Sequence, residues 1–203
     1  MATNDAWLDT VVEQIEDPQL PICDPHHHLW DFRPGETVDP RYLLDELLAD
    51  IGSGHNIVST VFIECGTMFN ASAPASLAPV GETEFVNGIA AMSASGLYGP
   101  CRVAAGIIGT VYLSEGDGAG AVLDAQIAAG GGRFRGIRQA ATWDPSPAVS
   151  NHRTEPPAGL YADSTFRSGF RHLAPREMSF EAWCYHPQID ELTDLARAFP
   201  DTT

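Results

Sequence analysis

The first apolar stretch of the chain ends in the run Asp24-Pro25-His26-His27-His28-Leu29-Trp30-Asp31. Side chains alternate across a strand, so His26 and His28 share one face and His27 takes the other. Two imidazoles on one face of a strand can bind a divalent metal ion, and α/β folds place their chemistry at strand ends. The alternative is a solvated turn or a tag-like cluster. The internal position of the run and the apolar residues on both sides of it favour a metal or active site.

Length and composition indicate a globular protein. The chain has 203 residues, of which 44% are hydrophobic and 19% charged, enough for one substantial domain or part of a larger one. Its net charge of -16 disfavours nucleic acid as a partner, because phosphates would be repelled. No uninterrupted apolar stretch approaches membrane length, and no signal-peptide pattern is visible. The four scattered cysteines predict free thiols, so we expect a soluble, cytoplasmic protein without a membrane partner.

Strand-like and helix-like segments alternate along the chain. The expected strands run from about residue 20 into the histidines and over 57–64, 102–110, 134–138 and 178–184. The expected helices lie at 43–51, around 85–90, at 119–129, after an N-cap at Asp163, and at 187–199. A further amphipathic helix is expected within residues 1–19. Five alternations with crossover-length connections predict a parallel sheet in a single domain, 1–203, with the βα units in 20–203.

The histidine run resembles the first-strand signature of the amidohydrolase-related (amidohydrolase 2) family, whose members are metal-dependent TIM-barrel hydrolases, lactonases and decarboxylases. Further similarities lie at 61–65, 134–138 and 185–188. The resemblance implies an α/β fold, the N-terminal part of a (β/α)8 barrel. A closed barrel needs about eight βα units and about 250 residues, so we expect an incomplete barrel of about five units. The chain would be a truncated form of a longer enzyme, or the other strands would come from another chain; we favour the first.

The same resemblance implies catalytic roles for His26 and His28 as metal ligands. His186, after the last expected strand, is a third catalytic candidate, and in some family members a histidine here binds the metal. Trp183 and Tyr185 lie beside it and are candidates for binding substrate.

Two arginines and a glutamate complete the candidate set. Arg135 and Arg138 lie on and just after a short strand, and we expect Arg138, nearer the strand end, to enter the pocket. An arginine there suits a substrate carboxylate, whereas a surface salt bridge is the alternative, especially for Arg135. Glu64, at the end of its strand, is either a pocket carboxylate or a partner for one of these arginines.

The expected function is a metal-dependent hydrolase acting on a small, anionic lactone, ester or amide. Zn²⁺ is the first choice of cofactor, while a metal-independent lactonase stays open. The family's later histidine and aspartate have no counterpart within 203 residues, and loss of that general base would cost roughly 10²–10⁴-fold in rate. One alternative is a non-oxidative decarboxylase on the same barrel. Another is a non-catalytic fragment that forms homo-oligomers through its open sheet edge.

Overall fold

The computed structural model describes residues 10–11, 13–31, 40–151 and 154–203. A five-stranded sheet with the order β1-β4-β5-β6-β7 forms its centre, and every neighbouring pair is parallel. The strands are β1 (Pro21–His27), β4 (Asn56–Ile63), β5 (Arg102–Thr110), β6 (Phe134–Ala140) and β7 (Ser179–Trp183). A small antiparallel pair, β2 (Trp30–Asp31) and β3 (Arg41–Tyr42), follows β1.

Helices follow each strand of the sheet along the chain. They are α2 (Leu44–Ile51), α3 (Val80–Ala94), α4 (Ala119–Ala129), α5 (Ser164–Phe170) and α6 (Ile189–Ala198). Short 3-10 helices lie at Leu113–Gly118, Leu160–Ala162, Ala174–Arg176 and His186–Gln188. The predicted alternation of strands and helices is therefore confirmed, and the β5 and α4 boundaries agree with those expected from the sequence.

The amino-terminal helix is not seen. Residues 10–11 and 13–19 are not helical, and the rest of the predicted helix lies outside the described residues. Val11, one of its expected apolar positions, is 70% exposed. A short helix is marginal in water unless one face packs against the protein, and this segment lacks such packing at Val11.

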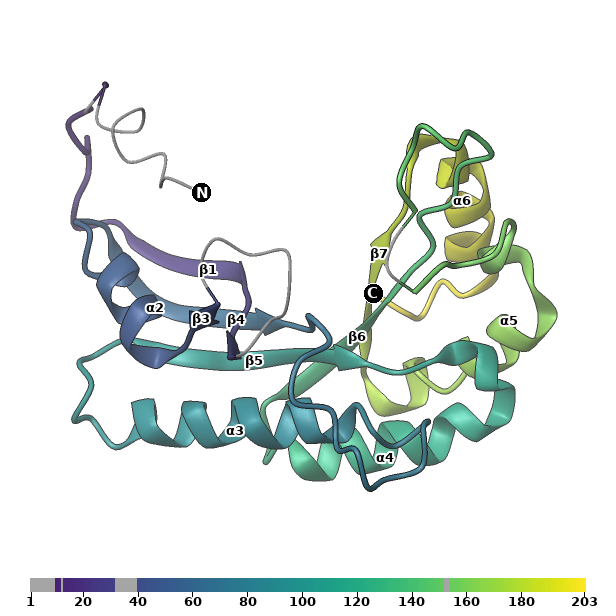
Figure 1. Cartoon of the computed structure of the whole chain (residues 1–203), viewed down its shortest axis with the longest axis horizontal. Coiled ribbons are helices and arrows are strands. Elements are labelled where there is room, and N and C mark those ends of the chain that lie inside the picture. Colours follow the sequence, from purple (N-terminus) through teal and green to yellow (C-terminus); the bar gives the residue numbers. More distant parts are fainter. Residues whose placement is uncertain (1–9, 12, 32–39, 152–153) are drawn as a thin grey trace.

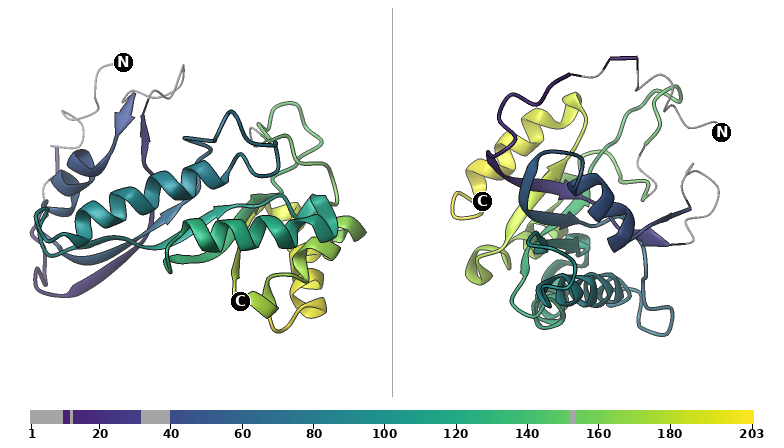
Figure 2. Two further views of the ribbon diagram at one scale, coloured as in Figure 1. Left: turned by 90° about the horizontal axis from the view of Figure 1, so that it is seen from below. Right: turned by 90° about the vertical axis from the view of Figure 1, so that its left-hand side faces the viewer.

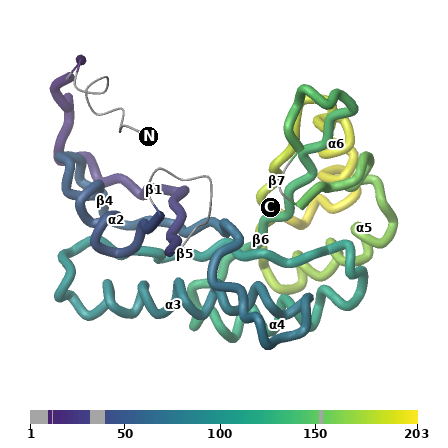
Figure 3. The backbone as a smooth tube through the Cα atoms, in the orientation of Figure 1, coloured from purple at the N-terminus to yellow at the C-terminus, as the bar shows by residue number. Residues whose placement is uncertain are grey.

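The sheet is strongly curled. In Figure 1, β5 runs nearly horizontally whereas β7 stands nearly upright, and β1 and β7 lie at opposite ends of the sheet. The right-hand view in Figure 2 looks along the longest axis of the molecule. The tube in Figure 3 follows the chain from the purple β1 to the yellow α6. This is the shape of part of an α/β TIM-type barrel, as the sequence predicts.

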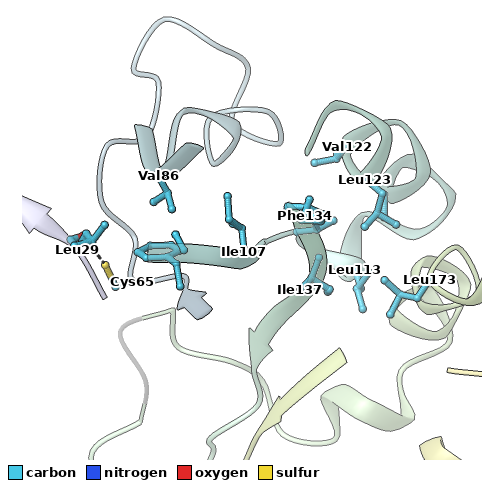
Figure 4. Packing of buried hydrophobic residues seen from close by; sticks show 14 of the residues in the cluster. Leu29, Cys65, Val86, Ile107, Leu113, Val122, Leu123, Phe134, Ile137 and Leu173 are labelled. Carbon is cyan, nitrogen blue, oxygen red and sulfur yellow. Dashed lines mark hydrogen bonds between the residues drawn. The ribbon is translucent and has the colours of Figure 1, made fainter. Parts of the chain in front are cut away.

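Much of the apolar core lies between the sheet and helices α3 and α4, which both lie below the sheet in Figure 1. Figure 4 shows Val86 of α3, Leu123 of α4, Ile107 of β5 and Phe134 of β6 packed together, each at most 3% exposed. Each buried side chain of this size contributes about 1.5–3 kcal/mol relative to exposure. Phe62 of β4 belongs to the same core. Because side chains alternate along a strand, the residues next to these core positions point to the other face of the sheet, where a site can form.

Local features agree with the sequence. Asp163 caps α5, since its Oδ1 accepts hydrogen bonds from the main-chain nitrogens of Thr165 and Phe166, both at 2.8 Å. The four cysteines are free thiols. Within the described ranges, the helices are all too short or too polar to cross a membrane.

Candidate active site

The end of β1 brings two imidazoles together. Nε2 of His26 lies 3.2 Å from Nε2 of His28, and the rings meet edge to face with centroids 4.9 Å apart. His27 projects to the opposite face, where it is buried and its ring packs against Phe62. The alternation predicted from the sequence is confirmed, and His26 and His28 share one face.

The protonation of His28 follows from its hydrogen-bond partner. Nδ1 of His28 lies 2.7 Å from the main-chain oxygen of Ile63. A carbonyl oxygen can only accept, so Nδ1 carries the proton and Nε2 of the neutral ring keeps its lone pair. Burial of the ring lowers the pKa of His28, which favours this neutral form. Nε2 of His28 is thus prepared to bind an electrophile.

A buried ion pair borders the histidines. Nε of Arg138 donates to Oε1 of Glu64 at 2.7 Å, and Nη2 donates to the main-chain oxygen of Glu64. The two side chains are only 8% and 6% exposed. Oγ1 of Thr110 donates to Oε2 of Glu64 at 3.1 Å. The sequence left open whether Glu64 is a pocket carboxylate or an arginine partner. The structure pairs it with Arg138, and Glu64 also lines a cavity.

The histidines and the arginine line one hollow of about 450 Å³. Its lining consists of His26, His28, Arg138, Glu181, Ala182 and Trp183. This volume is in the range of small-molecule sites. The guanidinium carbon of Arg138 lies 4.7 Å from the centroid of the Trp183 ring, so the two side chains form a cation–π contact. We call this hollow the histidine pocket.

Glu181 is a pocket residue that the sequence reasoning missed. It lies on β7, two positions before Trp183, and alternation on that strand would have placed both side chains on one face. Burial raises the pKa of the Glu181 carboxyl. The pocket thus contains one carboxyl group, that of Glu181, beside the histidines.

A second cavity of about 260 Å³ lies on the other side of the ion pair. Its polar lining comes from Glu64, Thr110, Tyr112, Ser114, Gln139 and Thr154. Glu64 faces this cavity while its partner Arg138 faces the histidine pocket. The ion pair therefore forms a wall between the two spaces.

The remaining candidates lie outside the histidine pocket. Arg135 is exposed and donates from Nη1 to the main-chain oxygen of Phe134. The Tyr185 hydroxyl donates to the main-chain oxygen of Ser150, and His186 is exposed in a short 3-10 helix. Because β7 ends at Trp183, neither Tyr185 nor His186 continues its alternation into the pocket.

The histidine pair fits part of a metal site. Two imidazole nitrogens bound to one tetrahedral zinc ion at 2.0–2.1 Å would lie about 3.3 Å apart, close to the 3.2 Å between the two Nε2 atoms. The hydrogen bond from His28 to Ile63 is the kind of outer contact that orients a ligand histidine. Within the described ranges, however, no group of three or more His, Cys, Asp or Glu side chains could hold a metal ion. The pair supplies two ligands.

Comparison with known sequences gives one distant relative. No protein-family model matches the chain. The "Uncharacterized protein y4mH" of Sinorhizobium fredii (strain NBRC 101917 / NGR234) is 29% identical over 199 residues, which covers 90% of this chain and 60% of the relative.

Comparison with solved structures identifies the fold. Two crystal structures of an amidohydrolase from Burkholderia multivorans, one with bound HEPES and one with bound zinc, match with a TM-score of 0.58 at 16% and 17% identity. Each match covers 88% of this chain and 54% of the other. Amidohydrolase 2 from Bifidobacterium longum subsp. infantis matches with a TM-score of 0.50 at 18% identity, over 91% of this chain and 59% of the other. The chain has an amidohydrolase-type fold and spans little more than half the length of these proteins, which supports the resemblance noted from the sequence.

Proposed function

We propose that this chain belongs to the amidohydrolase-related family and carries the first part of a hydrolase site, in which His26 and His28 bind a divalent metal ion, zinc in the first instance. The observation that carries the proposal is the convergence of the two Nε2 atoms, 3.2 Å apart, with the His28 lone pair set by its bond to Ile63. A bound divalent ion would supply Lewis acidity toward a substrate carbonyl and lower the pKa of water. The zinc found in one of the similar structures is consistent with this assignment.

Arg138 supports a small, carboxylate-bearing lactone, ester or amide as the substrate. Glu64 occupies the Nε and Nη2 side of the guanidinium. Among the residues that the structure describes, none accepts a hydrogen bond from Nη1, and Arg138 lines the same pocket as the histidines. Nη1 can therefore bind a substrate carboxylate while the histidine pair faces the reacting carbonyl. Because Trp183 packs on the guanidinium and Glu64 binds its edge, Arg138 is held in place before substrate arrives.

Zinc binding tests the histidine pair directly. The His28→Ala variant should lower zinc affinity by at least ~100-fold, more than the ~10–100-fold that loss of an outer contact costs. Isothermal titration with Zn²⁺ and elemental analysis after dialysis would measure this. His55→Ala is the matched control, since His55 is exposed and does not line the pocket. Equal affinities of His28→Ala and His55→Ala would exclude the proposed ligand role.

Ligand binding tests the arginine separately from the metal. The probes are a five-membered lactone that carries a carboxylate and its carboxamide analogue. Replacing the ion pair as a unit, Glu64→Met with Arg138→Met, should weaken binding of the carboxylate ~10–100-fold, because a hydrogen bond to a charged group contributes about 1.5–3 kcal/mol. Binding of the carboxamide should change little. Equal losses for both probes would count against a carboxylate site at Arg138.

A further inference from the structure

Strand β1 has weak determinants of its own register. Within the described structure it pairs with β4 alone, so it forms one edge of the sheet. Of its seven residues only His27 is buried; the others are exposed or half-buried. A slip of one residue would turn His27 into the pocket and His26 and His28 out of it, because side chains alternate along a strand. A buried apolar face usually prevents such a slip, and β1 offers little of one.

His27 contacts a buried hydroxyl at this point. Its Nε2 lies 2.9 Å from Oγ1 of Thr60, a residue of β4 that is fully buried. The pairing between β1 and β4 shifts register between Asp24 and His27, just before this contact. The His27–Thr60 hydrogen bond therefore holds the carboxyl end of β1, which follows the register shift and carries the histidines, against β4.

The same hydroxyl completes a second irregularity, between β4 and β5. Pairing of these strands shifts register between Ser59 and Val61, opposite Ala104. Ala104 has a φ of 48°, which is unfavourable for a residue with a Cβ and costs of order 1–2 kcal/mol. A bulge leaves a main-chain N–H without its strand partner, and here Oγ1 of Thr60 accepts the N–H of Ala104 at 2.9 Å. One buried hydroxyl thus links β1, β4 and β5.

We propose that Thr60 is a positioning residue: by binding His27 and Ala104 it fixes the register of β1 and so directs His26 and His28 into the same pocket. The consequence for metal binding rests on the function proposed above. The consequence for register does not, because it concerns the orientation of imidazoles in the metal-free chain. Thr60 itself faces away from the pocket and does not line it.

The test compares Thr60→Val with Thr60→Ser. Valine keeps the shape of threonine but removes the hydroxyl, so zinc affinity should fall ~10–100-fold; serine should restore it. In the metal-free chain, the Nδ1–H of His28 donates a hydrogen bond to the main-chain oxygen of Ile63. This proton should therefore give a slowly exchanging signal in the proton NMR spectrum. This signal should be lost or broadened in Thr60→Val and present in Thr60→Ser.

Thr83→Val is the matched control. Thr83 is also buried, and its hydroxyl has no hydrogen-bond partner among the described residues, so its loss should leave zinc affinity and the His28 signal unchanged. If Thr60→Val does not fold, His27→Phe removes the same contact while leaving Thr60 to bind Ala104, and the same losses are expected. Wild-type zinc affinity and an unchanged His28 signal in Thr60→Val, or in His27→Phe in its place, would overturn the proposal. Absence of zinc binding by the wild type would contradict the proposed function but leave the NMR test of register intact.

Discussion

Glu64→Met should lower the free energy of unfolding by about 3–5 kcal/mol, because it leaves Arg138 as a buried, unpaired cation. The two side chains are less than a tenth exposed, so we expect little water to reach Nε in place of the lost carboxylate. Oγ1 of Thr110 would lose its acceptor in the same step. Urea unfolding followed by circular dichroism would measure the change.

Two controls separate the effect of the unpaired Arg138 cation from the effects of a smaller side chain or of a lost carboxylate charge. The double variant Glu64→Met with Arg138→Met should recover most of the stability, since replacing a buried ion pair by apolar residues of similar size is often neutral. Asp124→Asn breaks an ion pair with Arg176 that has the same 2.7 Å distance but a carboxylate side chain 63% exposed, and it should have little measurable effect. A Glu64→Met variant as stable as Asp124→Asn would show that water reaches the pair.

Local patterns in the sequence predicted the sheet and the histidine pair. The β-branched run at 57–64 and the alanine-rich run at 119–129, which ends at glycines, have the composition that strands and helices need on their own. The common direction of His26 and His28 follows from strand alternation alone. Such features depend on residues a few positions apart, so they can be derived without knowledge of the three-dimensional arrangement.

Features that depend on register could not be predicted. Glu64 and Arg138 are 74 residues apart and meet across β5, so their pairing requires the strand order and the stagger of three strands. The role of Thr60 depends on a bulge at Ala104, and alanine gives no signal for a positive φ. The amino-terminal helix was predicted from an apolar pattern, but a pattern forms a helix only where that face finds a packing surface.

Raising the pH from 4 to 8 should destabilise the wild-type chain by about 3 kcal/mol relative to Glu82→Gln. The Glu82 side chain on α3 is buried, and its Oε1 accepts hydrogen bonds from the main-chain nitrogens of Cys65 at 3.0 Å and Thr67 at 2.9 Å. Oε2 has no partner among the described residues. Burial raises the pKa of this carboxyl from 4.5 to about 7, in spite of the two N–H donors.

The sign follows from proton binding. Between pH 4.5 and about 7 the folded chain retains the Glu82 proton while the unfolded chain has lost it. The stabilisation is therefore complete below pH 4.5 and is lost as the pH rises through 7; a shift of about 2.5 pKa units corresponds to about 3 kcal/mol. Glutamine keeps an oxygen acceptor but does not titrate, so the difference between the two chains isolates Glu82 from all other groups.

Unfolding free energies of both chains across this pH range provide the measurement. Glu84→Gln, at an exposed position on the same helix, is the matched control for replacing a glutamate by glutamine. A difference between wild type and Glu82→Gln that does not change with pH would mean that the Cys65 and Thr67 amides hold Glu82 ionised in the fold. Cys65 and Thr67 both lie within three residues of Glu64, so these hydrogen bonds connect α3 to the loop that follows the Glu64–Arg138 pair.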